Sequence, residues 1–125
     1  MLKIPTIFFL ITLSVLAVIH YIALQFFLYW KFWWFDIIMH GLGGAAIALG
    51  IYTLYDLRFG LPERLRNLIP ILLFTMVIAL LWEIFEIYIG IPIEDNYEVD
   101  TIVDLLMALV GATIGFFVGQ AINKL

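Results

Sequence analysis

Long apolar runs alternate with short polar breaks along the whole chain. Four of the runs are long enough to cross a bilayer, which takes about 20 apolar residues per helix. We place them near residues 4–28, 34–55, 68–90 and 101–122. The pattern predicts an all-α protein, a bundle of four transmembrane helices that forms a single domain over residues 1–125.

The three breaks between the runs differ in character. The first, residues 29–34, is an aromatic segment of the kind that settles at the level of the lipid head groups. The second, residues 56–67, is polar and contains Gly60 and Pro62, so it is predicted to be the main loop. The third, residues 90–99, carries acidic residues and no basic one.

Composition supports the membrane assignment. The chain is 66% hydrophobic and has only six Lys plus Arg and ten Asp plus Glu, with a mean hydropathy of +1.15. No soluble fold could hide this much apolar surface from water. Without a basic patch we expect no nucleic-acid partner. The chain has no cysteine, which excludes disulfides, thiolate metal sites and Cys nucleophiles.

Basic residues predict the orientation, because Lys and Arg concentrate on the cytoplasmic side of membrane proteins. In a four-pass arrangement only Lys31 falls on the outer side, and the other five fall on the inner side: Lys3, Arg58, Arg64, Arg66 and Lys124. Both termini and the main loop are therefore predicted to be cytoplasmic. The first apolar run is longer than the core of a signal peptide, so we expect a retained helix in a multi-pass protein of the cytoplasmic (cell) membrane.

Ionisable residues interrupt the apolar runs in three pairs: Asp36 with His40, Glu83 with Glu86, and Asp100 with Asp104. Each pair has i,i+3 or i,i+4 spacing, so both members share one face of a helix. In the predicted orientation the deeper members lie roughly 5 to 10 Å below the outer surface, at 1.5 Å per residue. An ionisable residue inside a membrane is costly and by default marks a functional site. We therefore predict one site built from three helices.

Charge suggests what this site holds. Five carboxylates in a low-dielectric layer repel one another, and Lys31 is the only cation predicted on that side. Either the carboxylates share protons or divalent cations neutralise them. Imidazole and carboxylate ligands suit Zn, Mn, Fe, Mg or Ca. The six predicted metal ligands are Asp36, His40, Glu83, Glu86, Asp100 and Asp104, with Glu83 and His40 as candidate catalytic residues.

Structural roles remain open for some of these residues. Asp36 and Asp100 could sit at water-exposed helix ends, with Asp100 or Thr101 as the N-cap of the last helix. His20, alone on an apolar helix, is predicted to be a hydrogen-bonded packing residue rather than a ligand. Trp82 is expected in the core or facing lipid.

A stripe of small residues follows Asp104 along the last helix. Gly111, Gly115 and Gly119 recur every four residues, a spacing that permits close contact between helices. The stripe could pack inside the bundle or join two copies in a homo-oligomer. Both uses remain open.

Taken in order, these motifs resemble the YjdF-like family of small uncharacterised integral membrane proteins. The resemblance rests on Asp36-x-x-x-His40 with Gly43-Gly44, Trp82-Glu83-x-x-Glu86, and Asp100-Thr101-x-x-Asp104 with Gly111. More distantly the chain is similar to the VanZ-like family, which is associated with the cell envelope and glycopeptide resistance. Where the VanZ-like pattern has Gln and Asn, this chain has Glu86 and Asp104, which adds negative charge and favours a cation.

Three classes of function fit these residues. The first is a metal-dependent hydrolase or transferase acting on the head group of a membrane lipid, although the outer side lacks an Arg or Lys phosphate clamp. The second is a cation or proton transport or channel component that uses the carboxylates as its site. The third is a non-enzymatic structural membrane subunit whose polar network specifies packing.

Overall fold

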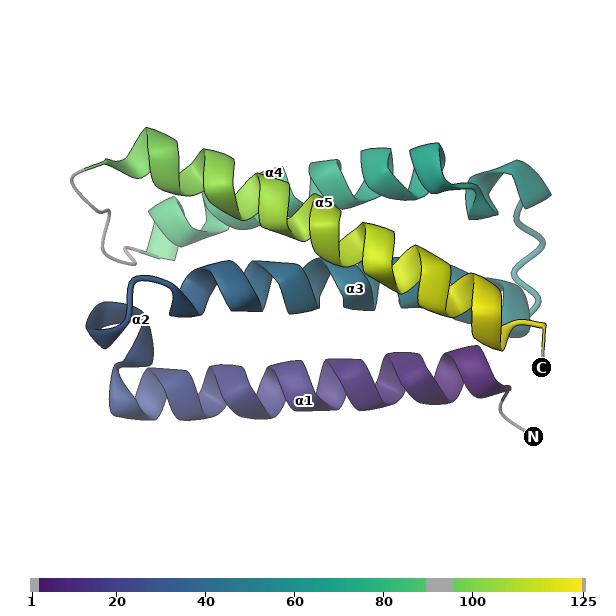
Figure 1. Cartoon of the computed structure of the whole chain (residues 1–125), viewed down its shortest axis with the longest axis horizontal. Helices are drawn as coiled ribbons and strands as arrows, with labels where there is room; N and C mark the ends of the chain where they lie inside the picture. Colours follow the sequence, from purple (N-terminus) through teal and green to yellow (C-terminus); the bar gives the residue numbers. More distant parts are fainter. Residues whose placement is uncertain (1–2, 90–95, 125) are drawn as a thin grey trace.

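The computed structural model describes residues 3–89 and 96–124, and this part of the chain is helical without any strand. The elements are α1 (Ile4–Phe26), α2 (Leu28–Lys31), α3 (Phe35–Asp56), the 3₁₀ helix η1 (Glu63–Arg66), α4 (Leu68–Ile89) and α5 (Tyr97–Ile122) (Figure 1). In the described ranges four helices, α1, α3, α4 and α5, are long and apolar enough to cross a membrane. The predicted all-α, four-span architecture is confirmed.

Two helix ends differ from the prediction. Helix α1 ends at Phe26 because Phe27 takes the left-handed conformation, with φ 57°, and the aromatic segment then forms the short helix α2. Helix α5 begins four residues early, at Tyr97 with Asn96 in the N-cap position. The alternative in which Asp100 or Thr101 caps this helix is therefore excluded. The acidic residues of its first turn extend the helix because they complement the positive end of its dipole.

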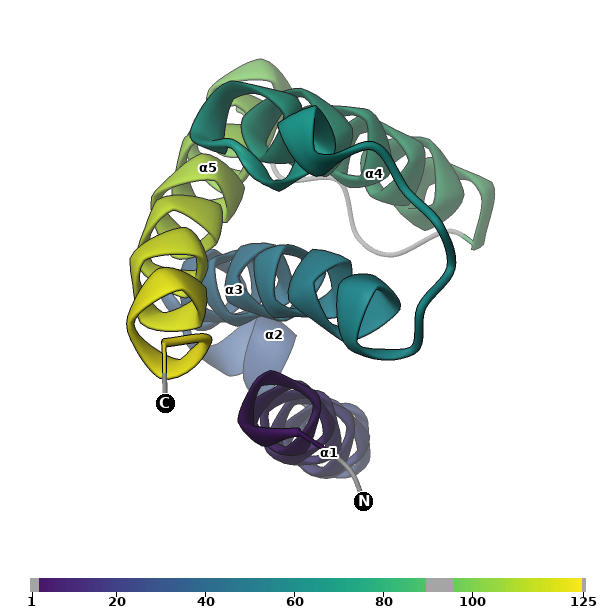
Figure 2. The same ribbon diagram turned by 90° about the vertical axis from the view of Figure 1, so that its right-hand side faces the viewer.

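Helix α3 lies at the centre of the bundle. It packs against α1 on one side and extensively against α5, while α4 packs on α5 and to a smaller extent on α3. Figure 2 shows α1 and α4 on opposite sides of α3. Because α3 contacts α1, α4 and α5, it holds these three helices in one bundle.

Glycines bring the backbones of α3 and α5 into direct contact. A Cβ atom at Gly111 would overlap the carbonyl group of Gly41, and one at Gly44 would overlap the carbonyl group of Ala108. Only glycine allows an approach this close. The contact fixes the height of α5 relative to α3, and with it the height of the acidic residues on the two helices.

The glycine stripe of α5 continues along the same contact. A Cβ at Gly115 would lie 2.7 Å from the carbonyl oxygen of Ala45, and one at Gly119 would lie 2.5 Å from the ring of Tyr52. The stripe is thus used inside the chain, which was one of the two open alternatives. Association of copies through Gly111, Gly115 and Gly119 stays a prediction.

Both termini lie at one end of the bundle, and α2 lies at the other (Figure 1). At the terminal end Thr6 donates a hydrogen bond of 2.9 Å from Oγ1 to Oδ2 of Asp56. Lys3 Nζ lies 3.7 Å from Oδ1 of the same residue. These contacts tie the start of α1 to the end of α3. Which end faces the cytoplasm stays a prediction.

Candidate metal centre

The six residues predicted as metal ligands come together near the end of the bundle that carries α2. Helices α3, α4 and α5 each contribute one pair, and the i,i+3 or i,i+4 spacing points both members of a pair the same way. Three sets have ligand atoms within 4.8 Å of one another: Asp36, His40 and Glu86; His40, Glu83 and Asp104; Asp36, Asp100 and Asp104. We call these six residues the acidic cluster.

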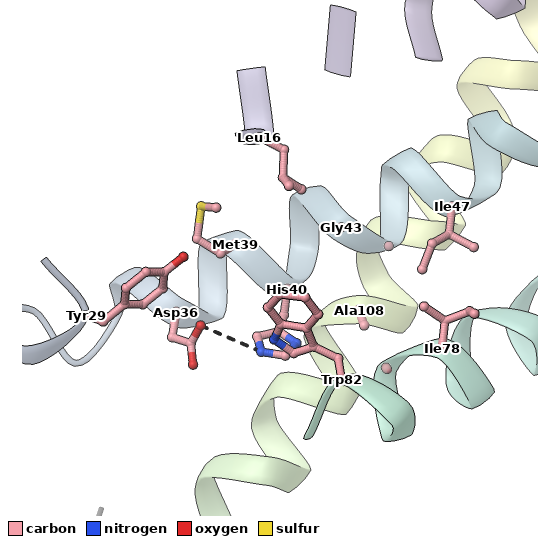
Figure 3. Close-up of a pocket in the computed structure, with 12 residues that line it drawn as sticks. Leu16, Tyr29, Asp36, Met39, His40, Gly43, Ile47, Ile78, Trp82 and Ala108 are labelled. Carbon is pink, nitrogen blue, oxygen red and sulfur yellow. Dashed lines mark ion pairs between the residues drawn. The ribbon is translucent and has the colours of Figure 1, made fainter. Parts of the chain in front are cut away.

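The imidazole of His40 lies at the centre of the acidic cluster. Its Nε2 atom is 3.7 Å from Oδ1 of Asp36, 3.7 Å from Oε1 of Glu83 and 3.9 Å from Oδ2 of Asp104. Figure 3 shows the first of these ion pairs as a dashed line. A charge-assisted hydrogen bond would bring nitrogen and oxygen to about 2.7–2.9 Å. The nitrogen therefore faces three carboxylates without hydrogen-bonding to any of these oxygens.

The core of the cluster is deeply buried. His40, Glu83 and Asp104 are 8%, 5% and 1% exposed. Among the described residues, three of their buried atoms have no hydrogen-bond partner: Nε2 of His40, Oε1 of Glu83 and Oδ1 of Asp104. A buried polar atom left unpaired costs about 1–3 kcal/mol, and more when it is charged. Three such atoms on neighbouring groups form a site that a cation would complete.

Two neighbouring side chains orient the carboxylates of α4. Thr101 donates a hydrogen bond of 2.9 Å from Oγ1 to Oε2 of Glu83, which leaves Oε1 directed at His40. Trp82 donates one of 2.6 Å from Nε1 to Oε1 of Glu86. Sequence reasoning missed both roles, since Thr101 was considered only as a cap and Trp82 only as a packing residue. Each residue is next to an acid of the cluster in the sequence, and this adjacency is the signal that could have indicated its role.

Aromatic side chains surround the outer edge of the cluster. Nδ1 of His20 is 2.7 Å from the hydroxyl of Tyr29, and the rings of His20 and Trp82 meet edge to face with centroids 6.3 Å apart. Burial raises the pKa of Tyr29 above its usual value, and the negative charges of Asp36 and Glu86 raise it further. The phenol thus stays protonated and can donate to His20. The prediction of His20 as a hydrogen-bonded packing residue is confirmed.

Fold and cluster together define the class: a polytopic helical membrane protein with a buried group of His and carboxylate side chains. A family model described as "Predicted membrane protein (DUF2238)" matches residues 2–124, and the chain belongs to this family. Searches of curated proteins and of solved structures returned no match. The name YjdF-like and the more distant similarity to the VanZ-like family stay predictions.

Proposed function

We propose that the acidic cluster binds a divalent metal ion in the membrane, with His40, Glu83 and Asp104 as its innermost ligands. One observation carries the proposal: the buried Nε2 atom of His40 lies 3.7–3.9 Å from three carboxylate oxygens and is hydrogen-bonded to none of them. An ion pair of a protonated imidazole would close to hydrogen-bond distance. A cation between the groups would give the unpaired atoms of His40, Glu83 and Asp104 a partner.

The spacing of the ligand atoms suits a metal ion. Metal–ligand bonds of about 2.1 Å place neighbouring ligand atoms about 3.0 Å apart and opposite ones about 4.2 Å apart. The separations of 3.7–3.9 Å around Nε2 of His40 lie between these values. Small rotations of the carboxylates would close the coordination shell.

The ligand set narrows the choice of metal. A neutral imidazole nitrogen suits Zn, Fe and Mn, whereas Mg and Ca prefer shells built from oxygen alone. Because His40 is one of the three innermost ligands, we favour Mn, Fe or Zn over Mg or Ca. The carboxylates supply hard oxygen ligands that all three favoured metals accept.

A second ion would fit the outer half of the acidic cluster. Asp36, Glu86 and Asp100 belong to the sets that overlap the core set through His40 and Asp104. Helix bundles that hold two metal ions also use carboxylates projecting from facing helices. Two divalent ions would offset four of the five carboxylate charges. This would lower the free-energy cost of burying the cluster in a low-dielectric layer.

The reaction that such a centre would suit is hydrolysis or transfer at the head group of a membrane lipid. A bound metal ion polarises a phosphoryl oxygen and lowers the pKa of bound water. We place the cluster in the outer part of the cytoplasmic membrane, with both termini inside, because five of the six basic residues lie at the other end. Transport of a cation or proton is the alternative use of the same carboxylates.

Metal content of the purified protein tests the proposal. We expect about one or two equivalents of Mn, Fe or Zn by inductively coupled plasma mass spectrometry, after exchange into metal-free detergent buffer. The double variant Glu83→Gln with Asp104→Asn should lose this metal while its helices stay intact by circular dichroism, since both changes preserve side-chain size.

A matched control removes the same number of charges outside the cluster. Glu63 and Glu98 are both exposed, so Glu63→Gln with Glu98→Gln should retain the metal of the wild type. Equal metal content in the wild type and in the Glu83/Asp104 variant would refute the assignment. So would a wild-type protein that binds none of these metals when they are supplied.

A further inference from the structure

An apolar groove adjoins the acidic cluster. It consists of two neighbouring cavities, of about 140 Å³ near the cluster and about 540 Å³ beyond it. The two cavities share Leu16, Gly43, Ile47 and Ile78 as lining residues, so they lie next to each other along the same helices. We call this space the lipid groove. It is bounded by α1, α3 and α4, with Tyr29 of α2 and Ala108 of α5 also lining its end near the cluster. Figure 2 shows α1 and α4 on opposite sides of α3.

Small residues on α3 form part of the floor of the lipid groove. Gly43 and Gly50 both line it. A Cβ at Gly43 would meet only Leu16 Cδ1, at 4.0 Å, whereas the neighbouring Gly44 lies against the backbone of α5. Glycine at position 43 is therefore not required for helix packing. Its effect is to leave room in the groove.

One end of the lipid groove, although mostly apolar, reaches polar side chains. Tyr29, Asp36 and His40 line the cavity nearest the cluster together with Trp82, and Figure 3 shows His40 and Trp82 beside it. The opposite end reaches Leu57 and Phe59, just beyond α3. The groove thus leads along a long apolar stretch to the side chains of Asp36 and His40, an order that suits the tail and head group of a lipid.

The length of the groove also suits a lipid tail. Helix α3 has 22 residues and at 1.5 Å per residue is about 33 Å long. Lining residues run from Asp36 in its first turn to Leu57 at its end. The hydrocarbon core of a bilayer is about 30 Å thick. In a membrane-spanning protein, hydrocarbon chains are the molecules that surround such an opening.

We propose that the lipid groove binds the hydrocarbon tail of a phosphate-bearing membrane lipid and places its head group at the acidic cluster. This inference rests on the proposed metal site. A cluster with five carboxylates attracts a phosphate only through a bound cation, for which phosphate oxygens are good ligands. The proposed ligand of that site is therefore a lipid with a phosphate head group and a tail that lies along α3.

A variant that fills the groove tests the inference. Gly43→Phe places a ring in the groove from a position where an added Cβ atom meets only Leu16 Cδ1 within 4 Å. Ile114→Phe enlarges a side chain on the exposed face of α5 and serves as the control, because Ile114 is 58% exposed. Each protein is purified in detergent from cell membranes, and its bound lipid and metal are quantified by mass spectrometry on the same sample.

We expect the wild type and Ile114→Phe to retain a phosphate-bearing lipid, and Gly43→Phe to lose most of it while keeping its metal. The masses of the extracted lipid distinguish a glycerophospholipid from a polyprenyl phosphate, and either supports the inference. Equal retention by Gly43→Phe, or a wild type that retains metal but no phosphate lipid, overturns it and leaves the metal site standing. A wild type without metal overturns the proposed function instead. Should Gly43→Phe fail to fold, Ile78→Trp blocks the groove from α4.

Discussion

At the residue scale, the hydroxyl of Thr101 determines which oxygen of Glu83 faces His40. It donates to Oε2 at 2.9 Å, and Oε1 is then the oxygen 3.7 Å from Nε2 of His40. Groups that hold a metal ligand in this way also tune its basicity. In the proposed metal centre, Thr101 is a positioning residue rather than a ligand.

We expect Thr101→Val to weaken metal binding by about 10- to 100-fold, the usual cost of removing an outer-shell hydrogen bond. Valine preserves the shape of threonine, so the loss of affinity would come from the missing hydrogen bond to the Glu83 carboxylate. Isothermal titration of Mn²⁺ or Zn²⁺ into metal-free protein measures the affinity. Thr113→Val is the matched control, because Thr113 on the same helix donates to the carbonyl of Leu109. An unchanged affinity in Thr101→Val would contradict the positioning role.

The sequence predicted the members of the cluster but not the contacts that orient them. Spacing along single helices placed Asp36 with His40 on one face, because helical periodicity is a local property. The contacts of Thr101 with Glu83 depend on how α5 packs against α4, and no local pattern specifies that arrangement. The same limit applies to His20. Its isolation in an apolar run indicated a packing role, but its partner Tyr29 could not be predicted, because the two meet only through the turn after α1.

At the element scale, the contact between α3 and α5 is the most extensive between helices in the described part of the chain. Gly111 is the tightest point of this contact on α5, since a Cβ there would overlap the carbonyl group of Gly41. The glycine spacing predicted close approach of two helices, and the structure supplies the partner helix. The helix ends were harder to predict, because Phe27 turns the chain without Gly or Pro at that position and α5 begins before its apolar run.

Gly111→Ala should destabilise the bundle by about 1–3 kcal/mol or more, the usual cost of overpacking a close contact. Gly43→Ala, in the helix that packs against it, should be neutral or stabilising by up to about 1 kcal/mol, since alanine favours helix and has space there. Unfolding in mixed detergent micelles measures both changes. If Gly111→Ala instead yielded folded monomers from a wild-type oligomer, the stripe would join copies as well as helices.

At the scale of the whole molecule, the two ends of the bundle carry opposite charge. Lys3 lies 3.7 Å from Asp56 at the end of α3, and Arg64 and Lys124 line one cavity with Tyr52 of the same helix. The acidic cluster lies toward the other end, where α3 and α5 begin. A membrane protein with this asymmetry is expected to insert with its basic end in the cytoplasm, and for this chain the orientation stays a prediction. The positions of the basic residues in the sequence predict this orientation, because the four apolar runs determine which loops share a side. The groove could not be predicted in the same way, because it arises from three helices at once.

Cysteine labelling in intact cells tests the orientation, and the chain suits it because it contains no native cysteine. A membrane-impermeant thiol reagent should label Lys31→Cys from outside, whereas Lys124→Cys should react only after the membrane is permeabilised. Glu63→Cys, exposed in the 3₁₀ helix η1, should behave like Lys124→Cys because it lies in the main loop. The reverse pattern would place the acidic cluster at the cytoplasmic surface. The geometry around His40 would then be unchanged, but its metal and any lipid head group would come from the inner leaflet and the cytosol.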